Sequence, residues 1–204
     1  MYWYNDEVQT LAAKAIPEKG TKQRLLFYGS SSIRLWPDVM TDFPQFEVIN
    51  RAFGGSTLAA CCWFFEQLVS ETDPDAVIFY AGDNDLGDGR HPEEVFLFFK
   101  VLMDKISKHF GDIPVAFVSV KPSFARHGII KSIRYTNEII SKEIDSNYPN
   151  CTFVNVFDQM NAINRQNWSL FDADGLHMTE DGYELWKRCL YNQFLTPKFL
   201  NPNR

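Results

Sequence analysis

Residues 25–36 read LLFYGSSSIRLW. Four apolar residues of strand character come first, Gly29 ends the run, and three serines follow at once. In a parallel α/β sheet, binding and catalytic sites are built just beyond the carboxyl ends of the strands. A serine held there on a tight turn can expose its hydroxyl group. The stretch therefore predicts a buried strand over 24–29 and nominates a nucleophilic serine at its end.

The rest of the chain repeats this alternation of apolar strand and amphipathic helix. Apolar runs predict strands over 24–29, 46–50, 75–80, 114–120 and 151–156. Helical spacing predicts helices over 5–16, 57–69, 92–106, 129–144 and 180–190, with a loop from about 157 to 176. Because the strands are continuous apolar runs, we expect helices on both faces of the sheet. The prediction is an α/β fold, a three-layer αβα sandwich around a five-stranded parallel sheet.

Length and composition favour one soluble globular domain over residues 1–204. A chain of 204 residues can bury one full core, and its 45% apolar and 23% charged content is ordinary for such proteins. A net charge of -6 argues against nucleic acid and anionic membrane surfaces as partners, since both need a basic face. The first residues lack the features of a signal peptide, and no apolar run approaches the ~18 residues of a membrane span. We expect a cytoplasmic location, and the oligomeric state stays open.

Two groups of side chains could suggest metal binding, and both favour a plainer interpretation. The cysteines are Cys61, Cys62, Cys151 and Cys189. Their spacing does not match that of metal ligands, so we expect buried reduced thiols. Asp83, Asp85 and Asp88 could suggest a calcium loop, but the glycine and terminal glutamate of an EF-hand are misplaced. A solvated acidic loop is the favoured interpretation, and no metal is expected.

Serines, a glycine pair, an amide side chain and an Asp/His pair follow four of the predicted strands. They are Ser30–Ser32 after the first, Gly54-Gly55 after the second, Asn84 after the third, and Asp174 with His177 after the last. The carboxyl ends of parallel strands share one edge of a sheet, so these residues should converge. Each feature is common in ordinary turns, and only their ordered combination is specific.

Nucleophilic catalysis by a serine requires a base, an orienting carboxylate and oxyanion donors, and these residues can supply each of them. A serine hydroxyl is a weak nucleophile until a base takes its proton, and His177 is the natural base. Asp174, three residues earlier, can hold the imidazole tautomer and stabilise the imidazolium. Attack on an ester carbonyl creates an oxyanion that needs preorganised donors. The Ser31 N–H, the Gly55 N–H and the Asn84 side-chain amide can supply them.

The four blocks resemble those of the SGNH, or GDSL-type, hydrolase superfamily. They are Gly29-Ser30-Ser31, the Gly54-Gly55 pair, Gly82-x-Asn84-Asp85 and Asp174-x-x-His177, in the usual order, and a closing match follows over 177–186. The resemblance implies a flavodoxin-like sheet, no cofactor and a small-molecule ester substrate. It implies Ser31 as nucleophile, Asp174 and His177 as its partners in a triad, and Ser31, Gly55 and Asn84 as oxyanion-hole residues.

The first block departs from the common Gly-Asp-Ser form, because Ser30 replaces the aspartate. Ser30 and Ser32 are therefore rivals of Ser31, which the register of the family favours. The predicted activity is hydrolysis of an acetyl or other short-acyl ester through an acyl-enzyme. A lysophospholipase or thioesterase, and a non-catalytic carbohydrate- or lipid-binding module, stay as alternatives. A flavodoxin-like nucleotide binder is disfavoured, because Ser30–Ser32 follow a single glycine rather than a glycine-rich loop.

The remaining candidates receive structural interpretations. Trp36 is expected in the core, Arg34 in an ion pair, and His91 and His109 at helix termini. Arg126 and His127 are expected in an exposed loop. Substrate specificity is expected to come from the loops 34–44, 86–92, 121–128 and 158–172.

Overall fold

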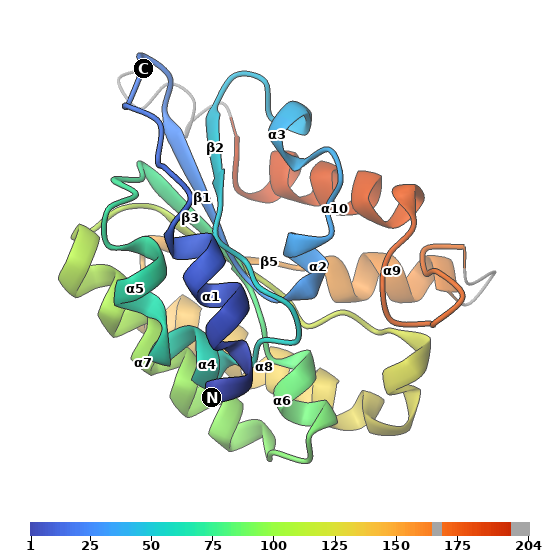
Figure 1. The fold of residues 1–204 in the computed structure, drawn as a ribbon. Helices are drawn as coiled ribbons and strands as arrows, with labels where there is room; N and C mark the ends of the chain where they lie inside the picture. The colour runs from blue at the N-terminus through green and yellow to red at the C-terminus, as the bar shows by residue number, and fades with distance from the viewer. Residues whose placement is uncertain (165–168, 197–204) are drawn as a thin grey trace.

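The computed structural model describes residues 1–164 and 169–196, with a five-stranded sheet between two layers of helices (Figure 1). All strand pairs are parallel, in the order β2-β1-β3-β4-β5. The strands are β1 (Arg24–Gly29), β2 (Glu47–Asn50), β3 (Ala76–Tyr80), β4 (Val115–Val118) and β5 (Cys151–Val154). This is the flavodoxin-like order, so the predicted fold class is confirmed.

Helices cover both faces of the sheet. One layer contains α1 (Asn5–Ala12), α4 (Leu58–Trp63), α5 (Phe65–Val69), α7 (Pro92–Phe110) and α8 (Ile130–Asn147). The other layer contains α2 (Ser31–Arg34), α3 (Val39–Asp42), α9 (Val156–Asn164) and α10 (Glu180–Gln193). The shorter elements η1 (Tyr2–Tyr4), α6 (Asp83–Gly87) and η2 (Phe124–Ile129) complete the described helices. Among the described residues, no helix is long and apolar enough to cross a membrane.

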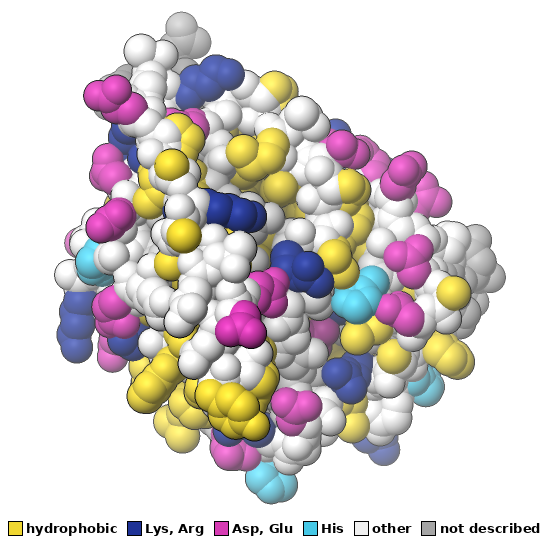
Figure 2. Space-filling view, viewed as in Figure 1, with side chains coloured by type: hydrophobic (Ala, Val, Ile, Leu, Met, Phe, Trp, Pro, Cys, Tyr) yellow, Lys and Arg dark blue, Asp and Glu magenta, His cyan; other side chains and the backbone are white. Residues whose placement is uncertain are grey.

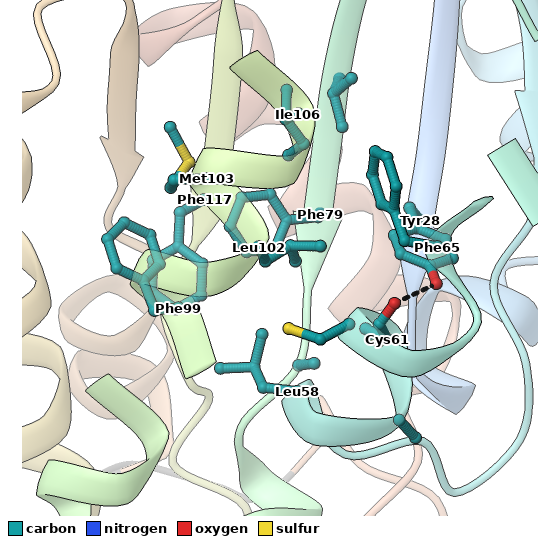
Figure 3. Packing of buried hydrophobic residues seen from close by; sticks show 14 of the residues in the cluster. Tyr28, Leu58, Cys61, Phe65, Phe79, Phe99, Leu102, Met103, Ile106 and Phe117 are labelled. Atoms are coloured by element: carbon teal, nitrogen blue, oxygen red, sulfur yellow. Dashed lines mark hydrogen bonds between the residues drawn. The ribbon is translucent and has the colours of Figure 1, made fainter. Parts of the chain in front are cut away.

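Strand β1 shows why the apolar run is continuous. Leu26 and Tyr28 pack into one hydrophobic cluster, whereas Leu25 and Phe27 pack into the other. Successive side chains of a strand point to opposite faces, so a sheet covered on both faces needs an apolar residue at every position. Tyr28 satisfies its hydroxyl group by donating to the Cys61 carbonyl oxygen, 2.7 Å away (Figure 3).

Aromatic side chains attach the helices to the sheet. The centroid of the Phe117 ring lies 5.2 Å from that of Phe79 and 5.4 Å from that of Phe99, so α7 packs on β3 and β4 (Figure 3). On the other face, Tyr80 and Trp186 pack edge to face with their ring centroids 4.8 Å apart. Because Tyr80 is the last residue of β3, this contact locks α10 against the end of the strand.

Three sequence predictions of helix and loop boundaries were wrong. The first helix ends at Ala12 rather than at residue 16. The helix predicted over 57–69 is divided at Phe64 into α4 and α5. Hydrophobic spacing reports the buried face of a segment and does not detect a local break in its hydrogen bonding.

The four cysteines are free and buried, as predicted.

The third error concerns the segment after β5, which was predicted as a loop and forms α9. Ser119, just beyond β4, accepts hydrogen bonds at its Oγ from the N–H groups of Val156 and Phe157, each at 3.0 Å. A helix start needs acceptors for such N–H groups, and here a distant residue supplies one. The contact depends on the tertiary fold, so the local pattern could not report it.

Candidate active site

Gly29 sets the direction in which the chain leaves β1. Its φ of +130° favours glycine, and a Cβ atom there would lie 1.9 Å from the Tyr80 carbonyl oxygen. The same Tyr80 carbonyl accepts the Ser30 N–H at 2.9 Å. The chain therefore turns tightly against the end of β3, and Ser31 begins α2 half-buried, with its N–H lacking an intrahelical acceptor.

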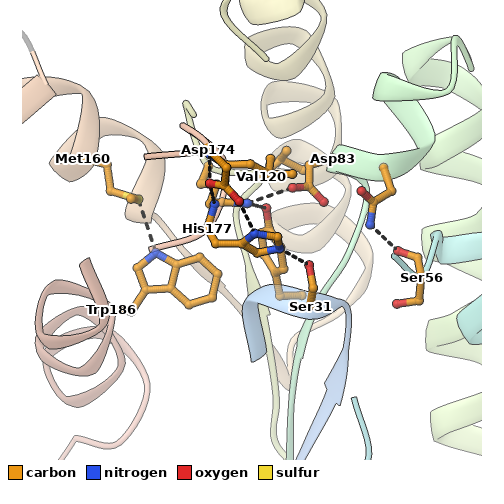
Figure 4. Close-up of polar contacts among 12 residues, drawn as sticks. Ser31, Ser56, Asp83, Val120, Met160, Asp174, His177 and Trp186 are labelled. Carbon is orange, nitrogen blue, oxygen red and sulfur yellow. Dashed lines mark hydrogen bonds and ion pairs between the residues drawn. The ribbon is translucent and has the colours of Figure 1, made fainter. Parts of the chain in front are cut away.

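Ser31, His177 and Asp174 form a continuous hydrogen-bonded line. The Oγ atom of Ser31 lies 3.1 Å from Nε2 of His177, and Nδ1 of His177 lies 2.5 Å from Oδ2 of Asp174. Figure 4 shows the His177 ring between the other two side chains. With the proton on Nδ1 donated to Asp174, Nε2 is left to accept the proton of the serine hydroxyl.

Asp174 is held by its own loop. Its Oδ1 atom accepts the N–H groups of Leu176 at 2.8 Å and His177 at 2.9 Å. These two backbone hydrogen bonds, together with the contact to the imidazole, lower the pKa of Asp174 to about 2. The Asp172 N–H closes the loop by donating to the His177 carbonyl oxygen at 2.9 Å. The carboxylate is thus ionised, and its Oδ2 is reserved for the imidazole.

Within the described residues, neither rival serine makes a hydrogen bond to His177. Ser30 and Ser32 are each 1% exposed, and the hydroxyl bonded to His177 is that of Ser31. Ser30 comes before the helix start and Ser32 faces inward from α2. Of the three serines, Ser31 is therefore the one whose hydroxyl group contacts His177.

The turn after β2 reaches the same edge of the sheet. The Phe53 N–H donates to the Gly29 carbonyl at 3.0 Å, which places the following Gly54-Gly55 pair beside the start of α2. Gly55 has a φ of +64°, and a Cβ atom there would meet nothing within 4 Å. Glycine is therefore favoured at this position by its backbone conformation rather than by lack of space.

Asn84 joins this turn from α6. Its side-chain Nδ2 donates to the Ser56 carbonyl oxygen at 3.1 Å, one residue after Gly55 (Figure 4). The next residue, Asp85, accepts the Leu58 N–H at 2.8 Å and ties the start of α4 to α6. The turn and the amide predicted as oxyanion donors are therefore adjacent.

The predicted solvated acidic loop was wrong for two of its three aspartates. Asp83 and Asp85 are buried, at 3% and 0% exposure, whereas Asp88 is exposed. Burial raises the pKa of Asp85 to about 6. Among the described residues, no group of acidic, histidine or cysteine side chains could hold a metal ion.

Asp83 belongs to a buried ion pair that the sequence analysis missed. The Lys121 ammonium lies 2.8 Å from Oδ2 of Asp83 and 3.2 Å from the Tyr80 hydroxyl, and its side chain is 1% exposed. Burial alone would raise the pKa of Asp83, and the Lys121 charge offsets this and holds it below its usual range. The available signal was a lysine directly after the strand predicted over 114–120, at the strand end where the other site residues gather.

Other sequence candidates take structural positions. Trp36 is buried, and Arg34 pairs with Glu7 at 3.4 Å, as predicted. His91 is the N-cap of α7, and His109 lies in its last turn.

The segments assigned to specificity are more ordered than predicted. Residues 121–128 hold η2 rather than a plain loop, with His127 exposed and Arg126 packed over Gly87. Residues 158–172 include most of α9, and 165–168 lie outside the described residues. A cavity of about 480 Å³ lies against the start of β4, lined by Tyr148 and Asn150 among others, away from Ser31.

Solved structures share this fold. A GDSL-like lipase from Bacteroides thetaiotaomicron VPI-5482 is 23% identical, with a TM-score of 0.74 over 92% of this chain and 94% of its own. A member of the lipolytic protein G-D-S-L family from Veillonella parvula DSM 2008 is 16% identical, with a TM-score of 0.72 over 85% and 98%. An acetylxylan esterase from Geobacillus stearothermophilus is 13% identical, with a TM-score of 0.69 over 85% and 94%. At these identities the likeness shows the fold.

No curated protein matched the sequence significantly. The family described as GDSL-like Lipase/Acylhydrolase matches residues 20–185. That range holds all the residues of the four blocks, from Gly29 to His177. Since the match covers well over half of the chain, the protein belongs to the GDSL-like lipase/acylhydrolase family of ester-hydrolysing enzymes.

Proposed function

We propose that the protein hydrolyses small carboxylic esters, with an acetyl or other short acyl group, by means of a Ser31–His177–Asp174 triad. The observation that carries the proposal is the line of contacts at 3.1 Å and 2.5 Å that joins the three side chains. Nucleophile, base and orienting carboxylate are each within hydrogen-bond reach of the next.

In this mechanism, the Ser31 hydroxyl attacks the ester carbonyl while His177 Nε2 takes its proton. The negative charge on the carbonyl oxygen is stabilised by the N–H groups of Ser31 and Gly55 and by the Asn84 amide. The imidazolium then protonates the departing alcohol, which leaves an acyl group on Ser31. Water, deprotonated by His177, releases the acid and restores the serine. Asp174 stays ionised and stabilises the imidazolium throughout.

Two observations support the oxyanion donors. The Gly55 N–H makes no hydrogen bond within the described residues, so it is available to a ligand. The Asn84 amide carries two hydrogens and uses one on the Ser56 carbonyl, which leaves the other for a substrate oxygen. The acetylxylan esterase with the same fold makes acetyl esters of sugars the first substrates to test.

The test is hydrolysis of p-nitrophenyl acetate by the wild type and by Ser31→Ala. We expect the variant to lose turnover by at least ~10³-fold while its thermal unfolding stays within ~2 °C of the wild type. Ser30→Ala is the matched control, and we expect it to keep most of the activity. Undiminished turnover in Ser31→Ala would refute the proposal.

Reaction with a fluorophosphonate probe separates an esterase from a non-catalytic binding module. The wild type should be labelled at Ser31, and a module without an activated serine should not react. A series of p-nitrophenyl esters and thioesters of increasing acyl length then distinguishes the short-acyl esterase from the lysophospholipase and thioesterase alternatives. A maximum rate with long acyl chains would overturn the short-acyl assignment.

A further inference from the structure

The N-terminal segment of the chain contacts the Gly54-Gly55 turn directly. Residues 1–19 precede the part of the chain that matches the family, and their sequence pattern predicts only an amphipathic helix. In the structure, the Tyr4 hydroxyl donates to the Gly55 carbonyl oxygen at 3.0 Å. The Gly54 N–H donates to the Glu7 carboxylate, at 3.0 and 3.1 Å from its two oxygens.

These contacts lie on either side of one peptide group. The peptide that joins Gly54 to Gly55 carries the N–H that the proposed mechanism points at the oxyanion. The peptide before it is held by Glu7, and the peptide after it is held by Tyr4. Glycine on both sides gives this peptide unusual freedom to rotate, so its orientation depends on its neighbours.

The absence of a side chain at Gly54 lets the Glu7 carboxylate approach the backbone of the turn. A Cβ atom on Gly54 would lie 3.2 Å from the Glu7 carboxylate and 3.3 Å from Nε of Arg34. Arg34, on the helix that begins with Ser31, also pairs with Glu7 at 3.4 Å. Glu7 therefore connects α1, the glycine turn and α2 in one cluster of charges and N–H groups.

Packing against aromatic neighbours holds the Tyr4 side chain beside the glycine turn. Tyr4 is 8% exposed, and its ring packs edge to face on that of Phe53, with the ring centroids 5.4 Å apart. Its neighbours Tyr2 and Trp3 are exposed. In Figure 2, hydrophobic side chains gather at the surface where Figure 1 places the N-terminus and α4. The exposed side chains of Tyr2, Trp3 and Trp63 belong to these two segments. Of the three consecutive aromatic residues, Tyr4 alone turns inward to the turn.

We propose that Tyr4 and Glu7 are positioning residues for the esterase reaction, which hold the Gly55 N–H toward the oxyanion. The inference rests on the proposed function of Ser31 and Gly55. A positioned donor acts mainly in the transition state, so its loss lowers kcat and leaves KM nearly unchanged. Removing a whole oxyanion donor costs roughly 10²–10³ in kcat, and loosening one should cost a part of that.

The test is steady-state hydrolysis of p-nitrophenyl acetate by Tyr4→Phe, Glu7→Ala and Glu7→Gln. Tyr4→Phe keeps the ring and removes only the hydroxyl, and we expect kcat to fall about 10-fold with KM within ~2-fold. Glu7→Ala should lose a similar factor. Glu7→Gln retains an amide oxygen that can accept the Gly54 N–H, so it should recover part of the loss.

The matched controls are Tyr2→Phe and Asp6→Asn. They make the same chemical changes at exposed positions of the same segment, and both should keep the wild-type kcat. Thermal unfolding of every variant identifies a general loss of folding. Should Tyr4→Phe misfold, the Glu7→Ala and Glu7→Gln pair still decides the question.

The possible outcomes are distinct. A kcat loss in Tyr4→Phe and Glu7→Ala, partly recovered in Glu7→Gln, supports the inference. Wild-type kcat in folded Tyr4→Phe and Glu7→Ala overturns it, and the loss of activity in Ser31→Ala would then leave the proposed function standing. Absence of hydrolysis by the wild type overturns both.

Discussion

Replacement of Lys121 by methionine tests the buried ion pair beneath the candidate site. The Lys121 and Asp83 side chains are 1% and 4% exposed, and their charged atoms lie 2.8 Å apart. Methionine keeps an unbranched apolar side chain and removes the charge. Asp83 is then left in a buried environment, where only the Tyr80 hydroxyl group and the charge of Arg126 still favour its ionised form.

The expected cost follows from the burial. Removing one partner of a buried pair leaves an uncompensated charge and costs about 3–5 kcal/mol of unfolding free energy. For a chain of this size, each kcal/mol shifts Tm by about 2–4 °C, so Tm should fall by about 6–20 °C. The removed cation also lies 5.2 Å from the Tyr80 ring centroid, a smaller part of the loss.

The pH dependence gives a second signature. In the wild type, the pKa of Asp83 lies below its usual range, so the pair adds stability above the unfolded pKa of ~4 and loses it on acidification. In the variant, burial without Lys121 raises the folded pKa of Asp83. The free-energy penalty of Lys121→Met should therefore shrink as pH falls below ~4, where the carboxyl becomes protonated, and should grow as pH rises.

The assay is urea denaturation at pH 5 and pH 8, with Lys142→Met as the matched control. Lys142 pairs with Glu138 at 2.6 Å on α8, with both side chains more than half exposed, so its loss should barely change stability. The double variant Lys121→Met/Asp83→Leu should recover much of the loss, since no charge is left buried. A loss below about 1 kcal/mol in Lys121→Met, or a loss equal at both pH values, would refute the reasoning.

Three further predictions concern the site and its frame. Asp174→Asn should lower kcat by about 10⁴-fold with little change in Tm, because an amide favours the wrong imidazole tautomer; retained p-nitrophenyl acetate turnover would contradict this. Gly29→Ala should cost roughly 3 kcal/mol or more, since its Cβ would lie 1.9 Å from a carbonyl oxygen, whereas Gly89→Ala meets nothing within 4 Å and should cost less; equal shifts in Tm would contradict this. Burial raises the pKa of Asp85 to about 6, so its contribution to stability is present below pH ~4 and lost as pH rises through 6. Asp85→Asn should abolish that part of the pH dependence in denaturation between pH 4 and 7, and parallel curves for both proteins would show the assignment to be wrong.

Local patterns in the sequence determined much of the architecture. The apolar run over β1 predicted its bounds, because a strand covered on both faces needs an apolar side chain at every position. The order of the polar blocks after the strands predicted their meeting, because parallel strands end at one edge. The spacing of Asp174 and His177 within one loop is likewise local. Patterns of this kind depend on neighbouring residues and can be read without coordinates.

Contacts between residues far apart in the sequence came from the folded structure. Ser31 and His177 are separated by 146 positions, and the register of the family favoured Ser31, but the hydrogen bond between the Ser31 hydroxyl and His177 is seen only in the structure. The hydrogen bond from the Tyr4 hydroxyl group to the Gly55 carbonyl oxygen also joins residues far apart in the sequence.

Lys121 against Asp83, and Ser119 at the start of α9, also join separate elements. No periodicity records such contacts, because they depend on how the helices pack on the sheet. The hydrophobic effect drives that packing, and each buried side chain contacts several residues that are distant in the sequence.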